Sequence, residues 1–346
     1  MAKIGEKVSS SNSRNVKQFL VENSALVILF LLIIIAIYFE GGSFLNINNL
    51  MNILLNNAVV GIIALGMTLI IISGGIDLSV GSASALTGLI ALATINHTAS
   101  IFLGVAVAFG VGILMGTLNG VLIAVFRVPA FIVTLGTMQI FRSLALHQWQ
   151  GGGILLGRIG GVEIERMEHV LGFRDFANTR FFTEFFQAGL SVTVIYWIIL
   201  VVLLGLFCKK TALGRHIYAV GSNERAANLS AIKVNLVKLS VYMIAGALVA
   251  FAALLEAGRM GSMNSATSGQ LYELQAIAAV IIGGTAMSGG RGRMIGTFYG
   301  ALTLGVINNT MNLMGLPSFL VGAIQGTIVI LAVLLQRVVE KRDRQF

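Results

Sequence analysis

The chain of 346 residues is 56% hydrophobic and only 11% charged, and its formal net charge is +9. Soluble domains carry about 25% charged residues, so this chain has too little polar surface to face water on all sides. We therefore predict an integral membrane protein. The long apolar runs contain few prolines and no alternation of period two. This pattern favours transmembrane helices over a β-barrel and predicts an all-α fold.

The positive charge does not by itself indicate a nucleic-acid partner, because basic loops are retained on the cytoplasmic side of membrane proteins. We expect no such partner. The single cysteine, Cys208, excludes an internal disulfide framework, and the four histidines are scattered without metal-ligand spacing. We expect neither a metal nor another cofactor. No clear small-residue cleavage site follows the long basic leader, so the first apolar run is expected to be a retained span.

The apolar runs predict about ten transmembrane helices, since about 20 apolar residues are needed to cross the hydrocarbon layer. The predicted spans are residues 24–39, 50–73, 78–95, 101–126, 128–147, 189–208, 236–256, 272–288, 294–313 and 317–336. The third and the eighth of these spans are the weakest.

The distribution of basic residues agrees with ten spans and with both termini in the cytoplasm. If the N-terminus is inside and the chain alternates, seventeen of the 23 Lys and Arg residues fall on inner segments and five on outer loops. Arg142 lies within a span. This asymmetry follows the positive-inside rule. We expect one transmembrane domain, residues 1–346, with cytoplasmic tails at 1–23 and 337–346.

Two long polar segments are predicted between the spans. Residues 209–238 are strongly basic and lie on the cytoplasmic side. Residues 148–188 form an external loop, which is either an amphipathic cover over the helix ends or a docking surface for an external partner. The only two prolines, Pro129 and Pro317, open similar segments five spans apart. An odd separation of this kind suggests an inverted 5+5 repeat.

Small residues mark two further features of the spans. Glycines at four-residue spacing predict faces where helix backbones pack closely, with a thin wall beside a pathway as the alternative. These glycines are Gly112, Gly116, Gly120, Gly292, Gly296 and Gly300. The segment 73–82 interrupts an apolar run and forms either a tight inner turn or a broken helix that lines a cavity. Its candidate residues are Gly74, Gly75, Asp77 and Ser79.

The polar residues inside the predicted spans are mostly amides, which are costly in a membrane and therefore informative. Each amide either forms hydrogen bonds between helices or lines a pathway for a neutral, polyhydroxylated solute. Arg142, toward the outer end of its span, would lie near such a pathway. The candidate pathway residues are Asn56, Asn57, Asn119, Gln139, Arg142, Asn308, Asn309, Asn312 and Gln325.

The chain lacks the motifs of an ATPase or of a hydrolytic enzyme. It contains no G-x-x-x-x-G-K-[ST], no H-E-x-x-H and no G-x-S-x-G sequence. We therefore expect no catalytic residues and no ATP site. No relay of Asp, Glu and His lies deep in the predicted spans, which argues against a carrier coupled to protons or ions.

Four segments carry a family resemblance: SGGIDLSVGS (73–82), RVPAFIVTLG (127–136), LGRHIYAVGSNE (213–224) and AIAAVIIGGTAMSGGRGR (276–293). Together they closely resemble the permease subunits of monosaccharide importers of the ATP-binding-cassette (ABC) class, the ribose permease type. The resemblance runs in order from about residue 24 to residue 336. It implies a multi-pass protein of the bacterial inner membrane that works as a dimer, with an identical copy or a paralogue.

The resemblance also implies partners and a substrate class. A separate cytoplasmic ATPase would energise the permease, and an external sugar-binding protein would deliver a monosaccharide, such as the pentose ribose. The ATPase would be contacted through Leu213, Gly214, Arg215, Gly221, Asn223, Glu224, Ala226 and Ala227. Ala231 departs from the family pattern, which commonly has a glycine there. An ABC permease for a nucleoside or a signalling molecule, or a self-sufficient secondary carrier, are the alternative functions.

Overall fold

The computed structural model describes residues 24–159, 162–163, 167–183 and 189–317, together with scattered positions up to residue 334. The two predicted tails and most of the last predicted span lie outside the described residues.

The described chain is mostly helical, with three small two-stranded antiparallel sheets. The helices are α2 (Ser24–Leu45), α3 (Ile47–Ile72), α4 (Val80–Thr98), α5 (Ile101–Ala124), α6 (Ala130–Trp149), α7 (Met167–Asn178), α8 (Val192–Lys210), α9 (Ala212–Ser222), α10 (Glu224–Leu229), α11 (Val234–Met260), α12 (Tyr272–Ile282) and α13 (Met294–Leu313). The strand pairs are β1 (Gly153–Leu155) with β6 (Ser262–Asn264), β2 (Arg158–Ile159) with β3 (Val162–Glu163), and β4 (Arg180–Phe181) with β5 (Leu190–Ser191).

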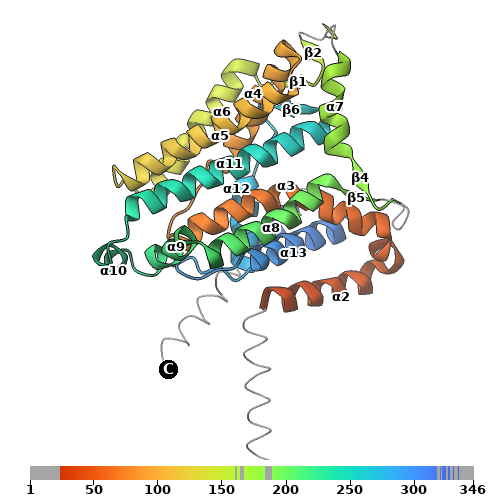
Figure 1. The fold of residues 1–346 in the computed structure, drawn as a ribbon. Helices are drawn as coiled ribbons and strands as arrows, with labels where there is room; N and C mark the ends of the chain where they lie inside the picture. The colour runs from red at the N-terminus through yellow and green to blue at the C-terminus, as the bar shows by residue number, and fades with distance from the viewer. Residues whose placement is uncertain are drawn as a thin grey trace, which may run out of the picture.

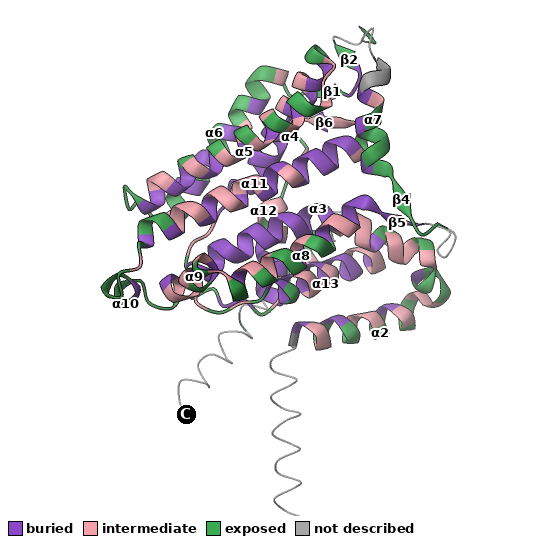
Figure 2. Ribbon diagram, viewed as in Figure 1, coloured by how far each residue is buried: buried purple, intermediate pink, exposed green. Residues whose placement is uncertain are grey.

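The long helices form a stack in which α3 and α11 are central (Figure 1). The short helices α9 and α10 lie at one end of the stack, whereas α7 and the strands lie at the other. Helix α3 is buried along 83% of its most apolar stretch, compared with 17% for the peripheral α2, as Figure 2 illustrates. The core therefore follows α3 and α11.

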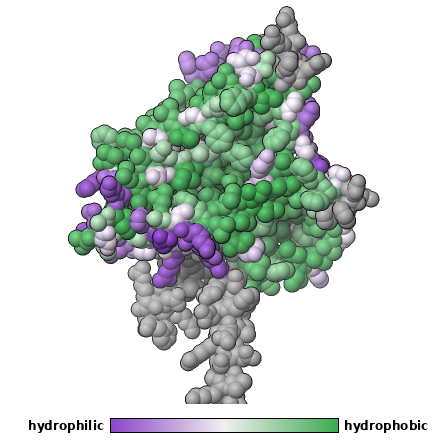
Figure 3. All heavy atoms as spheres, viewed as in Figure 1, coloured by the Kyte–Doolittle hydropathy of each residue, from purple (hydrophilic) through white to green (hydrophobic). Residues whose placement is uncertain are grey.

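Hydrophobic and hydrophilic side chains occupy different parts of the surface. Hydrophobic side chains cover the middle of the face seen in Figure 3, and hydrophilic ones gather toward its margins. Large exposed hydrophobic residues occur on the peripheral helices, for example Phe30 on α2, Phe102 on α5 and Ile132 on α6. This is the arrangement expected when lipid surrounds the protein, because apolar side chains then face an apolar solvent.

Six helices of the described residues are long and apolar enough to cross a membrane: α2, α3, α5, α6, α8 and α11. The predicted count of about ten spans is not confirmed by this set. The predicted span 78–95 corresponds to α4, which is shifted toward the C-terminus, and 294–313 coincides with α13. The span 272–288 is wrong, since α12 ends at Ile282 and residues 283–293 form a loop.

Helix α12 is too short to cross a bilayer. Its 11 residues extend about 16 Å, roughly half of the hydrocarbon thickness. The chain reaches it through residues 261–271, which run back along α4: Met263 packs against Gly88, and Gly269 against Gly81. We call residues 265–271 the re-entrant segment. It lies beside the transmembrane helices rather than above them.

The predicted glycine face of α5 is confirmed as a close-packing surface. A Cβ atom added to Gly116 would overlap the carbonyl oxygen of Tyr242 on α11, and one added to Gly112 would meet the carbonyl oxygen of Gly246. The second predicted face also packs closely, because Gly296 and Gly300 of α13 lie against backbone atoms of α12 and the residue after it. Small residues allow such approaches where no hydrophobic effect drives helices together.

A leucine at position 116 should therefore destabilise the bundle, whereas a leucine at position 110 of the same helix should not. A side chain at Gly116 meets backbone atoms that cannot rotate away, and overpacking of this kind costs about 1–3 kcal/mol. Gly110 has open space around it. Thermal midpoints of the detergent-solubilised protein, followed by size-exclusion chromatography, should fall for Gly116→Leu only. Equal midpoints for both variants would contradict the packing described here.

Candidate functional site

Two short helices, α9 and α10, lie at the end of the stack that holds the basic segment. We call them, residues 212–229, the elbow. The side chain of Thr211 caps α9 by accepting a hydrogen bond from Gly214 N at 3.0 Å. Asn223 caps α10 in the same way, accepting from Ala226 N at 3.0 Å. Such caps satisfy backbone donors at helix starts, and the extended backbone of Asn223 separates the two helices. The predicted contact residues 213–227 therefore all lie on this elbow.

The elbow is held against the helix bundle at Gly221. A Cβ atom there would overlap the carbonyl oxygen of Ile72, the last residue of α3. The same carbonyl oxygen accepts a hydrogen bond from Gly290 N at 2.8 Å, and Gly290 belongs to the loop between α12 and α13. We call this contact of Gly221, Ile72 and Gly290 the inner junction. It places α9 against the end of α3 and the loop between α12 and α13 at once.

Tyr218 adds a second tie between α9 and the loop that follows α12. Its hydroxyl donates a hydrogen bond to the carbonyl oxygen of Gly292 at 2.8 Å. Burial, together with the neighbouring Cys208 thiol, raises the pKa of the Tyr218 phenol to about 12. The phenol therefore stays protonated and remains a donor at physiological pH.

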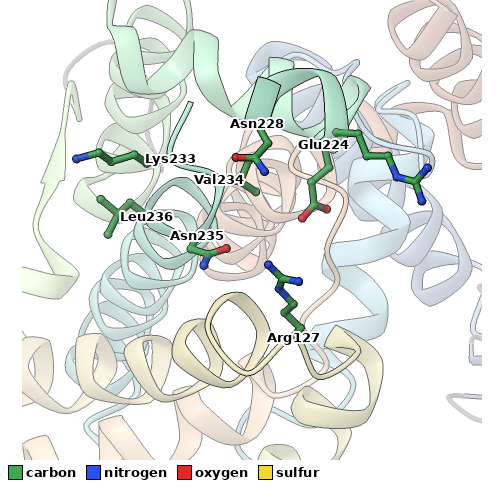
Figure 4. A pocket seen from close by; sticks show the side chains of 8 residues that line it. Arg127, Glu224, Asn228, Lys233, Val234, Asn235 and Leu236 are labelled. Atoms are coloured by element: carbon green, nitrogen blue, oxygen red, sulfur yellow. The ribbon is translucent and has the colours of Figure 1, made fainter. Parts of the chain in front are cut away.

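Charged side chains of α10 and of the neighbouring segments line two adjacent cavities. Glu224, the first residue of α10, forms an ion pair with Lys238 of α11 at 2.7 Å. Arg127, which follows α5, points toward the same carboxylate (Figure 4). The larger cavity, of about 570 Å³, lies beside α10 and the start of α11. The smaller, of about 290 Å³, shares Arg127 and Glu224 with it and reaches Gly74 and Gly75.

Residues 73–79 form a turn between α3 and α4, and its carboxylate is buried. Asp77 is 5% exposed and accepts hydrogen bonds from the backbone nitrogen of Ser79 at 2.7 Å and from its hydroxyl at 2.6 Å. Asn119 of α5 donates to the same pair of residues. Burial raises the pKa of Asp77, and the hydrogen bonds from Ser79 and Asn119 oppose this effect.

The structure separates the candidate pathway amides into several groups. Asn309 and Asn49, which is not among the predicted pathway residues, exchange two amide hydrogen bonds of 2.9 and 2.6 Å. They thereby join α3 to α13. Asn57 donates to the carbonyl oxygen of Ile53 one turn earlier and lies beside Gly305. These side chains act between or within helices. Gln139 and Asn312 are exposed, Asn308 is half-buried, and Gln325 lies outside the described residues.

Arg142 of α6 reaches the re-entrant segment. Its Nη1 atom donates hydrogen bonds to the carbonyl oxygens of Ser265 at 2.9 Å and of Ser268 at 3.0 Å. Irregular backbone at membrane depth leaves carbonyl groups without helical partners, and each unsatisfied group costs several kcal/mol. The guanidinium satisfies two of them. Thr267 and Gln270 of the same segment are exposed on the described chain.

The carboxylate that ends the seventh predicted span is not among the site residues predicted from the sequence. Glu256 of α11 is only 8% exposed, and its Oε1 atom accepts a hydrogen bond from the hydroxyl of Tyr272 at 2.7 Å. Arg259, one turn further along, donates to Asn56 Oδ1 of α3 at 3.3 Å. Glutamate and arginine three residues apart near a helix end could have indicated a polar cluster, since both project from one helix face.

Residues 49–333 match the family described as "Branched-chain amino acid transport system / permease component". The chain belongs to this permease family. The elbow, the inner junction and the re-entrant segment all fall within the matched residues. The permease is thus a transport subunit rather than an enzyme, and it is a multi-pass protein of the inner membrane.

Curated relatives cover nearly the whole permease. The "Ribose import permease protein RbsC" of Escherichia coli (strain K12) is 38% identical over 322 residues, which is 92% of this chain and 94% of the relative. The protein of the same name from Bacillus subtilis (strain 168) is 39% identical, covering 89% and 90% of the two chains. The "Galactose/methyl galactoside import permease protein MglC" of E. coli (strain K12) is 33% identical, covering 95% and 97%. No solved structure matches the chain.

Ala231, which departs from the family pattern, adopts a backbone conformation that glycine favours. Its φ angle is 59°, in the left-handed region, where a Cβ atom costs about 1–2 kcal/mol. The residue follows α10 in the short link to α11.

An Ala231→Gly permease should therefore have a higher thermal midpoint than the wild type, by a few degrees or less, because the strain outweighs the flexibility that glycine adds to the unfolded chain. The measurement is a melting curve in detergent. The control is Ala226→Gly, which lies in helical backbone within α10 and should lower the midpoint. A lower midpoint for Ala231→Gly would contradict the strained conformation.

Proposed function

We propose that this permease translocates a monosaccharide, a pentose such as ribose, as the membrane subunit of an ABC importer. The observation that carries this proposal is its identity of 37–39% to ribose import permeases over most of both chains. A permease named for galactose and methyl galactoside is less similar, at 33%. A cytoplasmic ATPase would supply the energy, because the sequence contains no phosphate-binding loop of its own. An external binding protein would deliver the sugar.

The elbow of α9 and α10 is the proposed contact with the ATPase. It carries the exposed residues Arg215 and Glu224 at the end of the bundle that the basic residues assign to the cytoplasm. A displacement of the elbow would reach α11 through the ion pair of Glu224 with Lys238. Through the inner junction it would reach the end of α3, where the turn at 73–79 begins, and the loop 283–293. Packed elements of this kind move as rigid bodies. The closure of the ATPase would thereby rock the helices that begin or end at these two loops.

The re-entrant segment is the proposed centre of the pathway, together with Arg142. Interrupted helices occur inside membranes where they line a cavity or are covered by protein, and in transporters they mark substrate sites near the midplane. The half-length of α12 and the exposed polar side chains of Thr267 and Gln270 support this assignment. Asn49 and Asn309, by contrast, satisfy each other and are proposed to hold helices together.

The finer architecture that we propose has ten spans, the eighth of them formed by the re-entrant segment together with α12. It also has an inverted 5+5 repeat and a second permease subunit, either an identical copy or a paralogue. Support for the repeat comes from the two prolines. Pro129 precedes α6 on the side of the elbow, whereas Pro317 follows α13, whose first residue lies near the inner junction. The two segments thus enter the bundle from opposite ends. The external loop around α7 is the proposed docking surface for the binding protein.

The function is tested by ATP-driven uptake in vesicles that contain the permease, the ATPase of the same operon and the binding protein. Uptake of a monosaccharide only in the presence of ATP and ATPase supports the proposal. Uptake of a nucleoside but not of any sugar would favour the alternative ABC permease. Movement of solute by the permease alone, driven by a gradient, would identify a secondary carrier.

Glu224→Ala should reduce ATP-driven uptake at least tenfold while the protein still inserts into the membrane. The Glu224 side chain is 58% exposed and its ion pair lies at the surface, so its loss should cost at most about 1 kcal/mol of stability. The matched control is Glu163→Ala, which removes another exposed ion-pair carboxylate, bound to Arg158 at 3.1 Å, from the external hairpin. Co-purification of the ATPase should weaken for Glu224→Ala only, and normal uptake would remove Glu224 from coupling.

Arg142→Ala should lower transport strongly but leave the ATPase bound, because the change releases the re-entrant segment and not the elbow. Two carbonyl oxygens lose their donor, and Arg142→Lys should recover only part of the activity, since an ammonium group lacks the planar fork of guanidinium. Uptake and ATPase co-purification are measured on the same preparations. Wild-type uptake by Arg142→Ala would rule out this role.

A further inference from the structure

The Glu256 carboxylate of α11 is buried, yet only one of its oxygen atoms has a partner. Oε1 accepts the hydrogen bond from the Tyr272 hydroxyl at 2.7 Å. Among the described residues, no donor lies within hydrogen-bonding distance of Oε2, and this atom is shielded from solvent. The side chain as a whole is 8% exposed. A buried acceptor without a donor is costly, and the cost is larger for a charged group.

Arg259, one helical turn away, carries an unpaired hydrogen-bond donor that complements this acceptor. Its Nη1 atom donates to Asn56 Oδ1 at 3.3 Å, but its Nε atom is buried and has no acceptor in the described chain. Glu256 and Arg259 form no ion pair within 4.0 Å, although residues three apart on a helix lie on one face. The same face therefore carries one unused acceptor and one unused donor.

The cluster of Glu256 and Arg259 lies in the outer half of the bundle, next to the start of α12. Tyr242 of α11 is level with the inner turn, because its hydroxyl donates to the carbonyl oxygen of Ile76. Glu256 lies fourteen residues further along the same helix, about 21 Å toward the external side. Tyr272, which binds Glu256, is the first residue of α12 and directly follows the re-entrant segment. A solute that enters from outside and reaches this segment would pass close to the cluster.

The two unpaired atoms, Glu256 Oε2 and Arg259 Nε, restrict the chemistry of a ligand. A cation would be attracted by Glu256 but repelled by Arg259, and the reverse holds for an anion. Among the described residues there is also no group of three His, Cys, Asp or Glu side chains that could hold a metal ion. A hydroxyl group can bind either atom, since it donates one hydrogen bond and accepts others. A molecule with adjacent hydroxyl groups could satisfy Oε2 and Nε together.

We propose that Glu256 and Arg259 form a hydroxyl-binding subsite for a polyhydroxylated solute in the outer half of the translocation pathway. This inference rests on the proposed function of the permease, which supplies a sugar as the solute. Tyr272 positions the carboxylate by occupying Oε1, which leaves Oε2 as the acceptor for the solute. Asn56 positions the guanidinium in the same manner. The subsite selects for hydroxyl groups during passage, after the binding protein has released the sugar.

The test compares sugars that differ by one hydroxyl group. Vesicles that contain the complete importer are supplied with saturating binding protein loaded with D-ribose or with its 2-deoxy, 3-deoxy or 5-deoxy form. Maximal uptake rates are measured for the wild type, Glu256→Gln and Tyr272→Phe. Because the binding protein is the same throughout, its own selectivity cancels when variants are compared. The ATPase rate and the amount of assembled complex are recorded for every sample.

The wild type should prefer D-ribose over one of the deoxy sugars by about tenfold, the size expected for a hydrogen bond to a charged group. Glu256→Gln should reduce this preference to less than about threefold by slowing D-ribose alone. Tyr272→Phe should keep the preference while lowering all rates, because it loosens α12 and leaves Oε2 in place. Glu256→Leu, which removes both oxygen atoms, should abolish the preference wherever the complex still assembles.

Two results would overturn the subsite. The first is a uniform loss of uptake for all sugars in Glu256→Gln, which would assign the carboxylate to the attachment of α12. The second is an unchanged preference in that variant. Both are distinct from a failure of the proposed function, in which the wild-type importer would move none of these sugars, and the subsite proposal would then fall together with that function.

Discussion

The backbone of a membrane protein must satisfy its own polar groups, and this constraint decides where the permease can interrupt a helix. The re-entrant segment is not helical and forms only isolated turn hydrogen bonds, yet it lies beside α4 rather than in an outer loop. It persists because other elements supply its partners. Arg142 from α6 donates to two of its carbonyl oxygens, and Gly81 and Gly269 let the two backbones touch. Polar side chains are costly in a membrane, so a cluster of them around one broken segment indicates where the lipid is excluded.

At the cytoplasmic end, too, close backbone contacts hold separate elements together. The inner junction joins three elements through backbone atoms, with Ile72 O accepting from Gly290 N and Gly221 packed against both. Backbone contacts of this kind transmit displacement without the slack of long side chains, because neither partner can change rotamer. Side-chain contacts surround the junction: Tyr218 binds the loop after α12, and Glu224 binds α11. The proposed ATPase contact is thus connected to both loops that bound the proposed pathway on the inner side.

Polar residues of the spans serve two purposes that composition alone does not separate. Asn49 and Asn309 complete each other's hydrogen bonds and leave nothing for a solute. Asn119 binds the buried turn at Asp77. Glu256 and Arg259 retain unused atoms although they are buried. An amide that is satisfied within the fold stabilises helix packing, whereas unused donors and acceptors are the ones that remain for a ligand.

The sequence by itself determined the membrane class, the helical fold, the close-packing glycine faces and the family, because each depends on local composition or on short motifs. It also predicted that the contact residues from Leu213 to Ala227 lie together, since they are neighbours along the chain. Only the tertiary structure decided that α12 ends at Ile282. The apolar run was long enough for a span, but the residues after Ile282 are held in a loop by contacts with α3 and α9. The cluster of Glu256, Arg259, Tyr272 and Asn56 joins three helices. Which polar atoms find partners there depends on distances between segments far apart in sequence, and no local pattern specifies those distances.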